Sequence, residues 1–154
     1  MGKINWGRVF LGGLIAGVIV NLSESLLNGV ILMQEWAEAM RALGKPAGPS
    51  AGQIAVYLVS GFLVGLSAVW LYAAIRPRYG AGPKTAACAG AAVWFLAYFL
   101  PTMTALPTDL FPARLLYIGV GVGLAEMLIG TLAGACVYKE EAAGTRTSAS
   151  AAGA

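Results

Sequence analysis

Four long apolar segments alternate with short polar connections along this chain. They cover residues 9–32, 54–75, 85–106 and 115–138. Each is over about 20 residues long, enough for a helix to cross a hydrocarbon core of about 30 Å. Helices are expected because lipid offers no partner for free backbone N–H and C=O groups, and because the segments lack the alternation of barrel strands. The pattern predicts an all-α, integral membrane four-helix bundle formed by residues 1–139.

The connections contain residues that end helices. Two glycines and two prolines lie within residues 44–49, which predicts a break after the first helix. Before that break, Trp36, Met40 and Leu43 recur at helical spacing, with charged residues between them. This predicts that the first helix continues, or restarts, as an amphipathic segment along the membrane surface. Pro101 predicts a kink near one end of the third helix.

The first segment has a second interpretation as a cleaved signal peptide. Two basic residues precede the apolar run 9–20, and Ser23 and Ser25 could form a small-residue cleavage site. The apolar character resumes at residues 26–33, which favours a helix that spans the membrane. A mature N-terminus near residue 26 would contradict the four-span prediction.

Composition supports a membrane environment and excludes several chemistries. Of the 154 residues, 58% are hydrophobic and 11% charged, whereas soluble domains carry about 25% charged residues. The mean hydropathy is +0.75. The chain has no histidine, which removes the usual general base and the commonest metal ligand. No nucleophile elbow or phosphate loop is present, so we expect no enzymatic activity, catalytic residue, cofactor or metal.

The basic residues indicate orientation rather than nucleic-acid binding. They are scattered between apolar segments, whereas a nucleic-acid site gathers them on one face. With four spans, both termini share one side of the membrane, and cytoplasmic sides carry more Lys and Arg. The terminal side holds seven of the ten basic residues and the other side three: Lys3, Arg8, Arg76, Arg78, Lys84, Lys139 and Arg146, against Arg41, Lys45 and Arg114. Both termini, with a disordered tail at 140–154, are therefore predicted to be cytoplasmic.

Two carboxyl groups interrupt the apolar segments. Glu24 lies in the first segment and Glu126 in the fourth. A charge at the bilayer centre costs about 2.5–3.5 kcal/mol on insertion scales, so such groups usually face the bundle interior. Each acid lies on a stripe of small or polar residues spaced by three or four: Gly13, Gly17, Asn21, Glu24 and Asn28, and Gly119, Gly123, Glu126, Gly130 and Gly134. Small residues let helices approach closely, so these glycines, with Gly61 and Gly65 of the second segment, are predicted packing positions.

The two acids are predicted to lie at similar depths, about 5 Å apart along the membrane normal. If the first and fourth helices are neighbours, the two carboxyl groups could meet and would then share a proton or a cation. The candidate polar site comprises Asn21, Glu24, Ser25, Asn28 and Glu126. Three interpretations stay open: polar groups that hold the bundle together, a site for protons or ions, and a pocket for a small substrate.

Three short stretches resemble a family of small, uncharacterised four-helix membrane proteins of bacteria. They are Ile4-Asn5-Trp6, then Trp36 with the later residues 40–44, and residues 129–134 near the end of the fourth segment. The resemblance extends over most of the chain in its layout. It implies a location in the bacterial inner membrane and supplies no activity.

Three classes of function are compatible with these features. The first is a small protein that transports ions, protons or small molecules through Glu24 and Glu126, which would need a homo-oligomer because four spans seldom enclose a pathway. The second is a structural or accessory subunit that binds a larger membrane protein through small-residue helix faces. The third is a membrane enzyme acting on a lipid or quinone, which the missing histidine disfavours.

Overall fold

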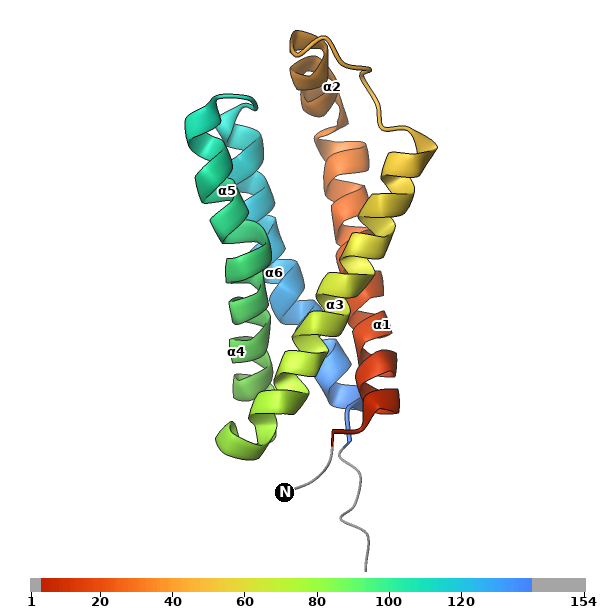
Figure 1. The fold of residues 1–154 in the computed structure, drawn as a ribbon, viewed down its shortest axis with the longest axis vertical. Helices are drawn as coiled ribbons and strands as arrows, with labels where there is room; N and C mark the ends of the chain where they lie inside the picture. Colours follow the sequence, from red (N-terminus) through yellow and green to blue (C-terminus); the bar gives the residue numbers. More distant parts are fainter. Residues whose placement is uncertain (1–3, 140–154) are drawn as a thin grey trace, which may run out of the picture.

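The computed structural model describes residues 4–139, and these form an all-α structure (Figure 1). The elements are α1 (Trp6–Leu26), the π-helical turn η1 (Leu27–Ile31), α2 (Met33–Ala42), α3 (Ala51–Tyr79), α4 (Pro83–Trp94), the π-helical turn η2 (Phe95–Phe99), α5 (Leu100–Ala105), the 3₁₀ turn η3 (Leu106–Thr108) and α6 (Ala113–Val137). The all-α prediction is confirmed. The predicted tail at 140–154 lies outside the described residues.

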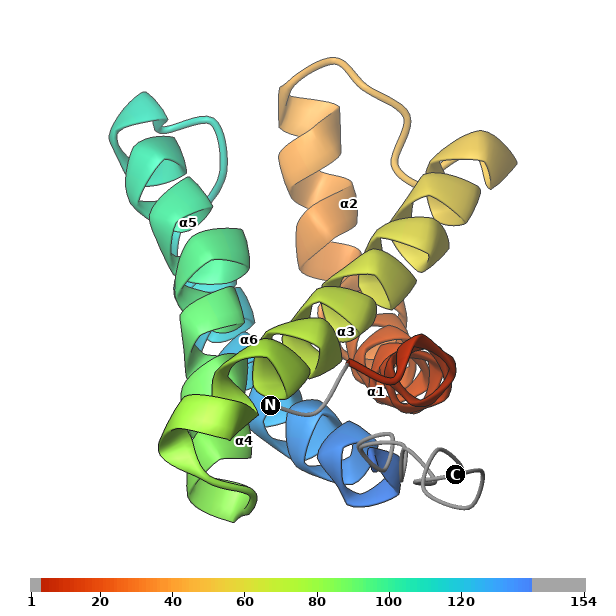
Figure 2. The same cartoon turned by 60° about the horizontal axis from the view of Figure 1, so that its bottom comes forward.

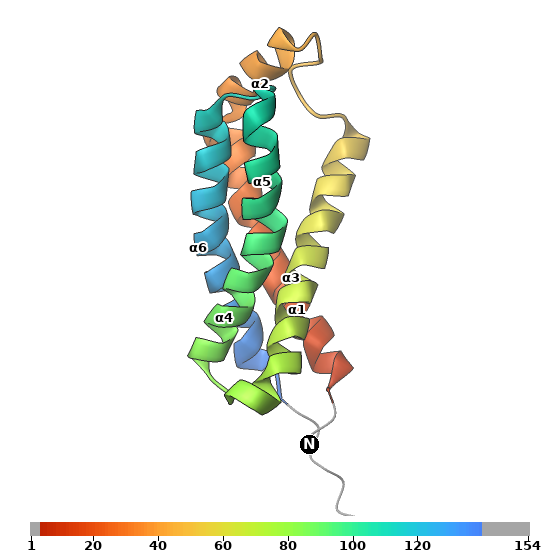
Figure 3. The same ribbon diagram turned by 60° about the vertical axis from the view of Figure 1, so that its left-hand side comes forward.

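Four helical stretches are long and apolar enough to cross a membrane: Trp6–Ile31, Ala51–Tyr79, Pro83–Thr108 and Ala113–Val137. This is consistent with a membrane protein. These four stretches, which we call the four spans, run up and down in turn, so that the start of α1 and the end of α6 lie at one end of the molecule (Figures 1 and 3). We call this the terminal end, and the opposite end, where α2 lies, the α2 end.

Local sequence explains where the helices begin and break. The side chain of Ser50 accepts a hydrogen bond from the backbone N–H of Gln53, and the Gln53 side chain accepts one from the Ser50 N–H, which satisfies two free donors at the start of α3. The first span ends at Leu32, whose φ of −102° and ψ of 8° depart from helical values. The amphipathic segment is therefore a restart, α2, and not a continuation of α1.

The third span is interrupted just before its proline. The π-helical turn η2 ends at Phe99, and Pro101 lies in the first turn of α5. Proline lacks an N–H and its ring clashes with the carbonyl group four residues earlier, so the helix widens instead of continuing with regular hydrogen bonds. The distortion that Pro101 predicts thus takes the form of a π-helical turn.

The core has three layers along the bundle. The layer near the terminal end includes Val9, Tyr72 and Tyr138, the middle layer includes Val20, Ala68, Val93 and Met127, and the layer near the α2 end includes Leu27, Leu32, Ala39 and Leu115. Helix α3 contributes buried residues to the first two layers and none to the third. Its residues 51–60 are all exposed, and Figures 1 and 2 show this first third of α3 leaning away from α5 and α6.

Glycines allow α1, α3 and α6 to approach closely. A Cβ atom placed on Gly65 of α3 would lie 2.4 Å from the Gly17 nitrogen and 2.8 Å from the Gly13 oxygen of α1. A Cβ on Gly134 of α6 would lie 2.6 Å from the Gly12 oxygen. Because these neighbours are backbone atoms, they cannot rotate away as a side chain can. The bundle is therefore tightly closed in its middle and terminal parts and open toward the α2 end.

Candidate functional site

A series of polar side chains extends inward from the α2 end. Trp36 of α2 donates a hydrogen bond from Nε1 to Asn28 Oδ1 at 2.8 Å. The Nδ2 group of Asn28 donates to Glu24 Oε2. From the other side, the Tyr98 hydroxyl donates to Glu126 Oε1 at 2.6 Å. These polar side chains thus come from four separate stretches of the chain: α1 with η1, α2, η2 and α6.

The two carboxyl groups meet at the centre of this series. The Glu24 and Glu126 side chains lie close enough to each other for a Coulombic interaction between them. Glu126 is 3% exposed, and no donor among the described residues lies within hydrogen-bonding distance of its Oε2 atom. Both carboxylates are acceptors when ionised, so they can bond to each other only if one carries a proton. Such a pair can hold a proton or another positive charge between α1 and α6.

Both π-helical turns lie at this site. Asn28 belongs to η1 and Tyr98 to η2. A π-helical turn inserts an extra residue into a helix and shifts the directions of the side chains around it, and such turns occur frequently at functional sites. Here the two turns bring Asn28 toward Glu24 and Tyr98 toward Glu126.

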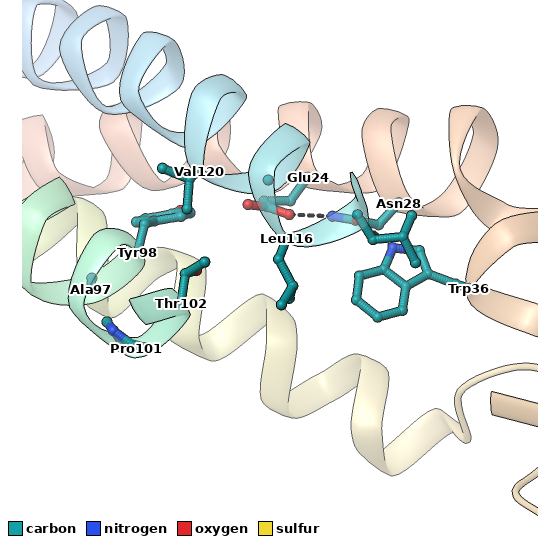
Figure 4. Close-up of a pocket in the computed structure, with 11 residues that line it drawn as sticks. Glu24, Asn28, Trp36, Ala97, Tyr98, Pro101, Thr102, Leu116 and Val120 are labelled. Carbon is teal, nitrogen blue, oxygen red and sulfur yellow. Dashed lines mark hydrogen bonds between the residues drawn. The ribbon is translucent and has the colours of Figure 1, made fainter. Parts of the chain in front are cut away.

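A cavity of about 210 Å³ lies on the α2 side of the acid pair (Figure 4). Glu24 and Tyr98 line its inner end, and Glu126 lies behind them outside the lining. The remaining lining residues come from η1, α2, the third span and α6: Asn28, Trp36, Ala97, Pro101, Thr102, Leu115, Leu116, Gly119 and Val120. One acid thus contacts the cavity and the other is sealed from it.

Helix α2 is fixed beside the cavity by contacts with α6 and the loop before it. Glu35 forms an ion pair with Arg114, and both side chains are partly exposed to the surroundings. The Trp36 ring packs edge-on against Phe111, with ring centroids 5.5 Å apart. These contacts place the Trp36 indole where it can bond to Asn28.

Three of the five residues predicted for the polar site lie together in it: Glu24, Asn28 and Glu126. Asn21 instead faces α3: its Nδ2 group donates to the Leu58 backbone oxygen there and to the Gly17 backbone oxygen of its own helix. Ser25 is exposed and does not line the cavity. Lying on the same helical stripe as Glu24 did not bring Asn21 into the polar site, because α1 packs against both α3 and α6.

The glycines predicted for packing also differ in their surroundings. Seven of the eight have atoms of another helix at or within van der Waals distance of a Cβ position: Gly13, Gly17, Gly61, Gly65, Gly123, Gly130 and Gly134. Gly119 has no such neighbour within 4 Å and lines the cavity instead. The absence of a side chain at Gly119 therefore gives the cavity space.

Sequence reasoning missed Trp36 and Tyr98 as members of the site. From the sequence, Trp36 was predicted to lie on the amphipathic segment along the membrane surface, outside the candidate polar site. The useful signal for Tyr98 was its spacing: Tyr98 and Thr102 are four residues apart and lie on one face of the third span, and both line the cavity. No sequence signal connects Trp36 with Asn28, because the break at Leu32 decides where α2 lies.

Removing the Tyr98 hydroxyl is expected to destabilise the protein. In Tyr98→Phe the ring still packs against Gly123, but Glu126 Oε1 loses its donor in a buried position. A buried acceptor without a partner costs about 1–3 kcal/mol, so the free energy of unfolding should fall by that amount. Reversible unfolding in mixed micelles, followed by circular dichroism, measures it. The exposed Tyr117 provides the control: Tyr117→Phe should change nothing, and equal effects of the two variants would contradict the assignment.

Comparison with known proteins adds no functional assignment. The sequence matches no family model, and no curated protein or solved structure is significantly similar to it.

Proposed function

We propose that this chain is a multi-pass membrane protein that transports protons or other small cations by means of Glu24 and Glu126. The observation that carries the proposal is the closeness of these two acids inside the bundle, with one oxygen of the buried Glu126 left without a hydrogen-bond partner among the described residues. A bundle that needed only polar contacts to hold α1 and α6 together could use uncharged side chains, at lower cost in a membrane. A carboxyl pair can in addition take up and release a positive charge.

The surroundings of the pair support transport by a gated site more than an open channel. The cavity reaches Glu24 from the α2 end. Toward the terminal end, the next buried polar side chains among residues 4–139 are Thr131 and Thr85, and each donates to a backbone carbonyl in its own region. The close contacts of Gly12 with Gly134 lie in the same half. Access in this structure is thus from one end, and transport requires a second arrangement of the helices.

We also propose that the protein lies in the bacterial inner membrane with both termini in the cytoplasm and works as a homo-oligomer. The excess of Lys and Arg at the terminal end supports this orientation. The exposed, mostly apolar first third of α3, residues 51–60, offers a surface to which a second copy could bind. The alternative, an accessory subunit that binds a larger partner through small-residue faces, has less support, because most of the predicted glycines already contact helices of the same chain.

Proteoliposomes test this function. Vesicles containing the purified protein should dissipate an imposed pH gradient, reported by a pH-sensitive dye inside them, at least tenfold faster than empty vesicles. In Glu24→Gln the rate should return to that of empty vesicles, because an amide does not titrate. Glu38→Gln, the same change at an exposed acid of α2, should leave the rate unchanged. Wild-type vesicles no faster than empty ones would overturn the proposal.

A further inference from the structure

The wall of the cavity is mostly apolar, with its charge confined to one position. Ala97, Pro101, Leu115, Leu116 and Val120 form much of the surface. Among the described lining residues Glu24 is the only one with a charged side chain. A ligand that fills this space therefore needs one positive group and an apolar body.

The volume of the cavity is larger than a bare ion or a proton requires. A single water needs about 10–15 Å³ of such space, so 210 Å³ has room for several waters. A proton bound to Glu24 would leave most of this space unfilled. The space suits a compact molecule of several non-hydrogen atoms.

The oxygen atoms of the lining side chains do not suit a hard metal ion. Calcium takes six to eight oxygen ligands, and magnesium takes six in strict geometry. Here Asn28 Oδ1 already accepts from Trp36, and the Tyr98 hydroxyl donates to Glu126. Glu24 Oε2 also accepts from Asn28, which leaves Glu24 Oε1 and the Thr102 hydroxyl as the side-chain oxygens of the described wall that take part in none of these hydrogen bonds. Two such groups are too few to replace the hydration shell of a divalent cation.

Two aromatic side chains also line the cavity. In Figure 4 Tyr98 and Trp36 lie on opposite sides of Glu24, and both line the cavity. Tryptophan and tyrosine rings attract alkylammonium groups through their π electrons, most strongly where water is excluded. A carboxylate between two aromatic side chains is a combination that recognises an organic cation.

We propose that the cavity binds a small organic monocation of the ammonium type, with its charge at Glu24 and its alkyl groups against Trp36, Tyr98 and the apolar wall. This inference rests on the proposed transport function, since it names the class of cation that enters the site. Glu126, sealed behind Glu24, holds the proton that the pair shares when no cation is bound.

Equilibrium dialysis with radiolabelled tetramethylammonium tests the proposal on the full-length protein in a mild non-ionic detergent. Binding should be saturable and should not be displaced by neopentyl alcohol, which has a similar shape and no charge. Magnesium chloride at the same ionic strength as a sodium chloride control should not compete either. In Glu24→Gln, affinity should fall at least 30-fold. Binding that neopentyl alcohol displaces, or that Glu24→Gln leaves unchanged, would overturn the proposal.

A pair of tryptophan variants shows whether the cavity is the binding site. Trp36→Leu should weaken binding about tenfold, whereas Trp70→Leu, at a half-exposed position on α3 outside the cavity, should leave it unchanged. Trp36→Phe should retain most of the affinity, which separates a role of the ring from loss of folding. Equal effects at Trp36 and Trp70 would overturn the assignment to the cavity.

The vesicle assay distinguishes the failure of this proposal from the failure of the proposed function. Proton movement that depends on Glu24, without any tetramethylammonium binding, would overturn the ligand class and support transport. Saturable binding with no movement of protons, with or without a tetramethylammonium gradient, would support the ligand class and overturn transport.

Discussion

Glu126→Gln is expected to reduce proton flux in proteoliposomes at least tenfold while leaving the fold as stable as the wild type or more stable. The amide oxygen can accept the hydrogen bond from Tyr98, and the amide NH₂ group can donate to Glu24. The substitution also removes the repulsion between two acids held away from water. The hydrogen-bonding pattern is thus kept and only the ability to titrate is lost.

This variant separates a transport role from a role in holding the bundle together. If Glu126 only links α6 to α1 and η2, glutamine should serve equally well and the flux should equal that of the wild type. Glu126→Asp gives a second comparison, because it keeps a carboxyl group and shortens the side chain by one carbon, so it should retain part of the flux. The exposed Glu38→Gln controls for changes in reconstitution. Wild-type flux in Glu126→Gln would remove this residue from the mechanism.

The second large effect is expected at the crossing of α1 and α3. In Gly65→Ala the new methyl group would lie 2.4 Å from the Gly17 nitrogen, so the two helices must move apart. Overpacking of this kind costs about 1–3 kcal/mol, and we expect the upper end because the neighbouring atoms are backbone. The free energy of unfolding in mixed micelles should fall by about 3 kcal/mol, followed by circular dichroism as denaturing detergent is added.

Gly121 provides the matched control for this change. It also lies within a span, in α6, but a Cβ atom there would have no neighbour within 4 Å. Gly121→Ala should therefore leave stability unchanged, or raise it by up to about 1 kcal/mol through the higher helix propensity of alanine. Equal destabilisation by the two substitutions would mean that helix backbone effects, and not close packing, govern both positions.

Sequence determined the elements of this protein because their causes are local. The four apolar segments are helical since no other structure satisfies the backbone without water. Glu24 and Glu126 could be recognised as unusual because a carboxyl group in an apolar segment is costly wherever the helix packs. The capping residues and the glycines and prolines near residue 45 likewise act on their immediate neighbours.

Only the tertiary structure decided which polar groups join those acids. Asn21 and Asn28 lie on one stripe of the first span, yet Asn21 bonds to α3 and Asn28 bonds to Glu24. The difference arises because a π-helical turn changes the direction of Asn28 and because two helices pack on neighbouring faces of α1. Tyr98 and Trp36 reach the site from segments far away in sequence. Their contacts depend on helix crossings and on the break at Leu32, which side-chain periodicity does not encode.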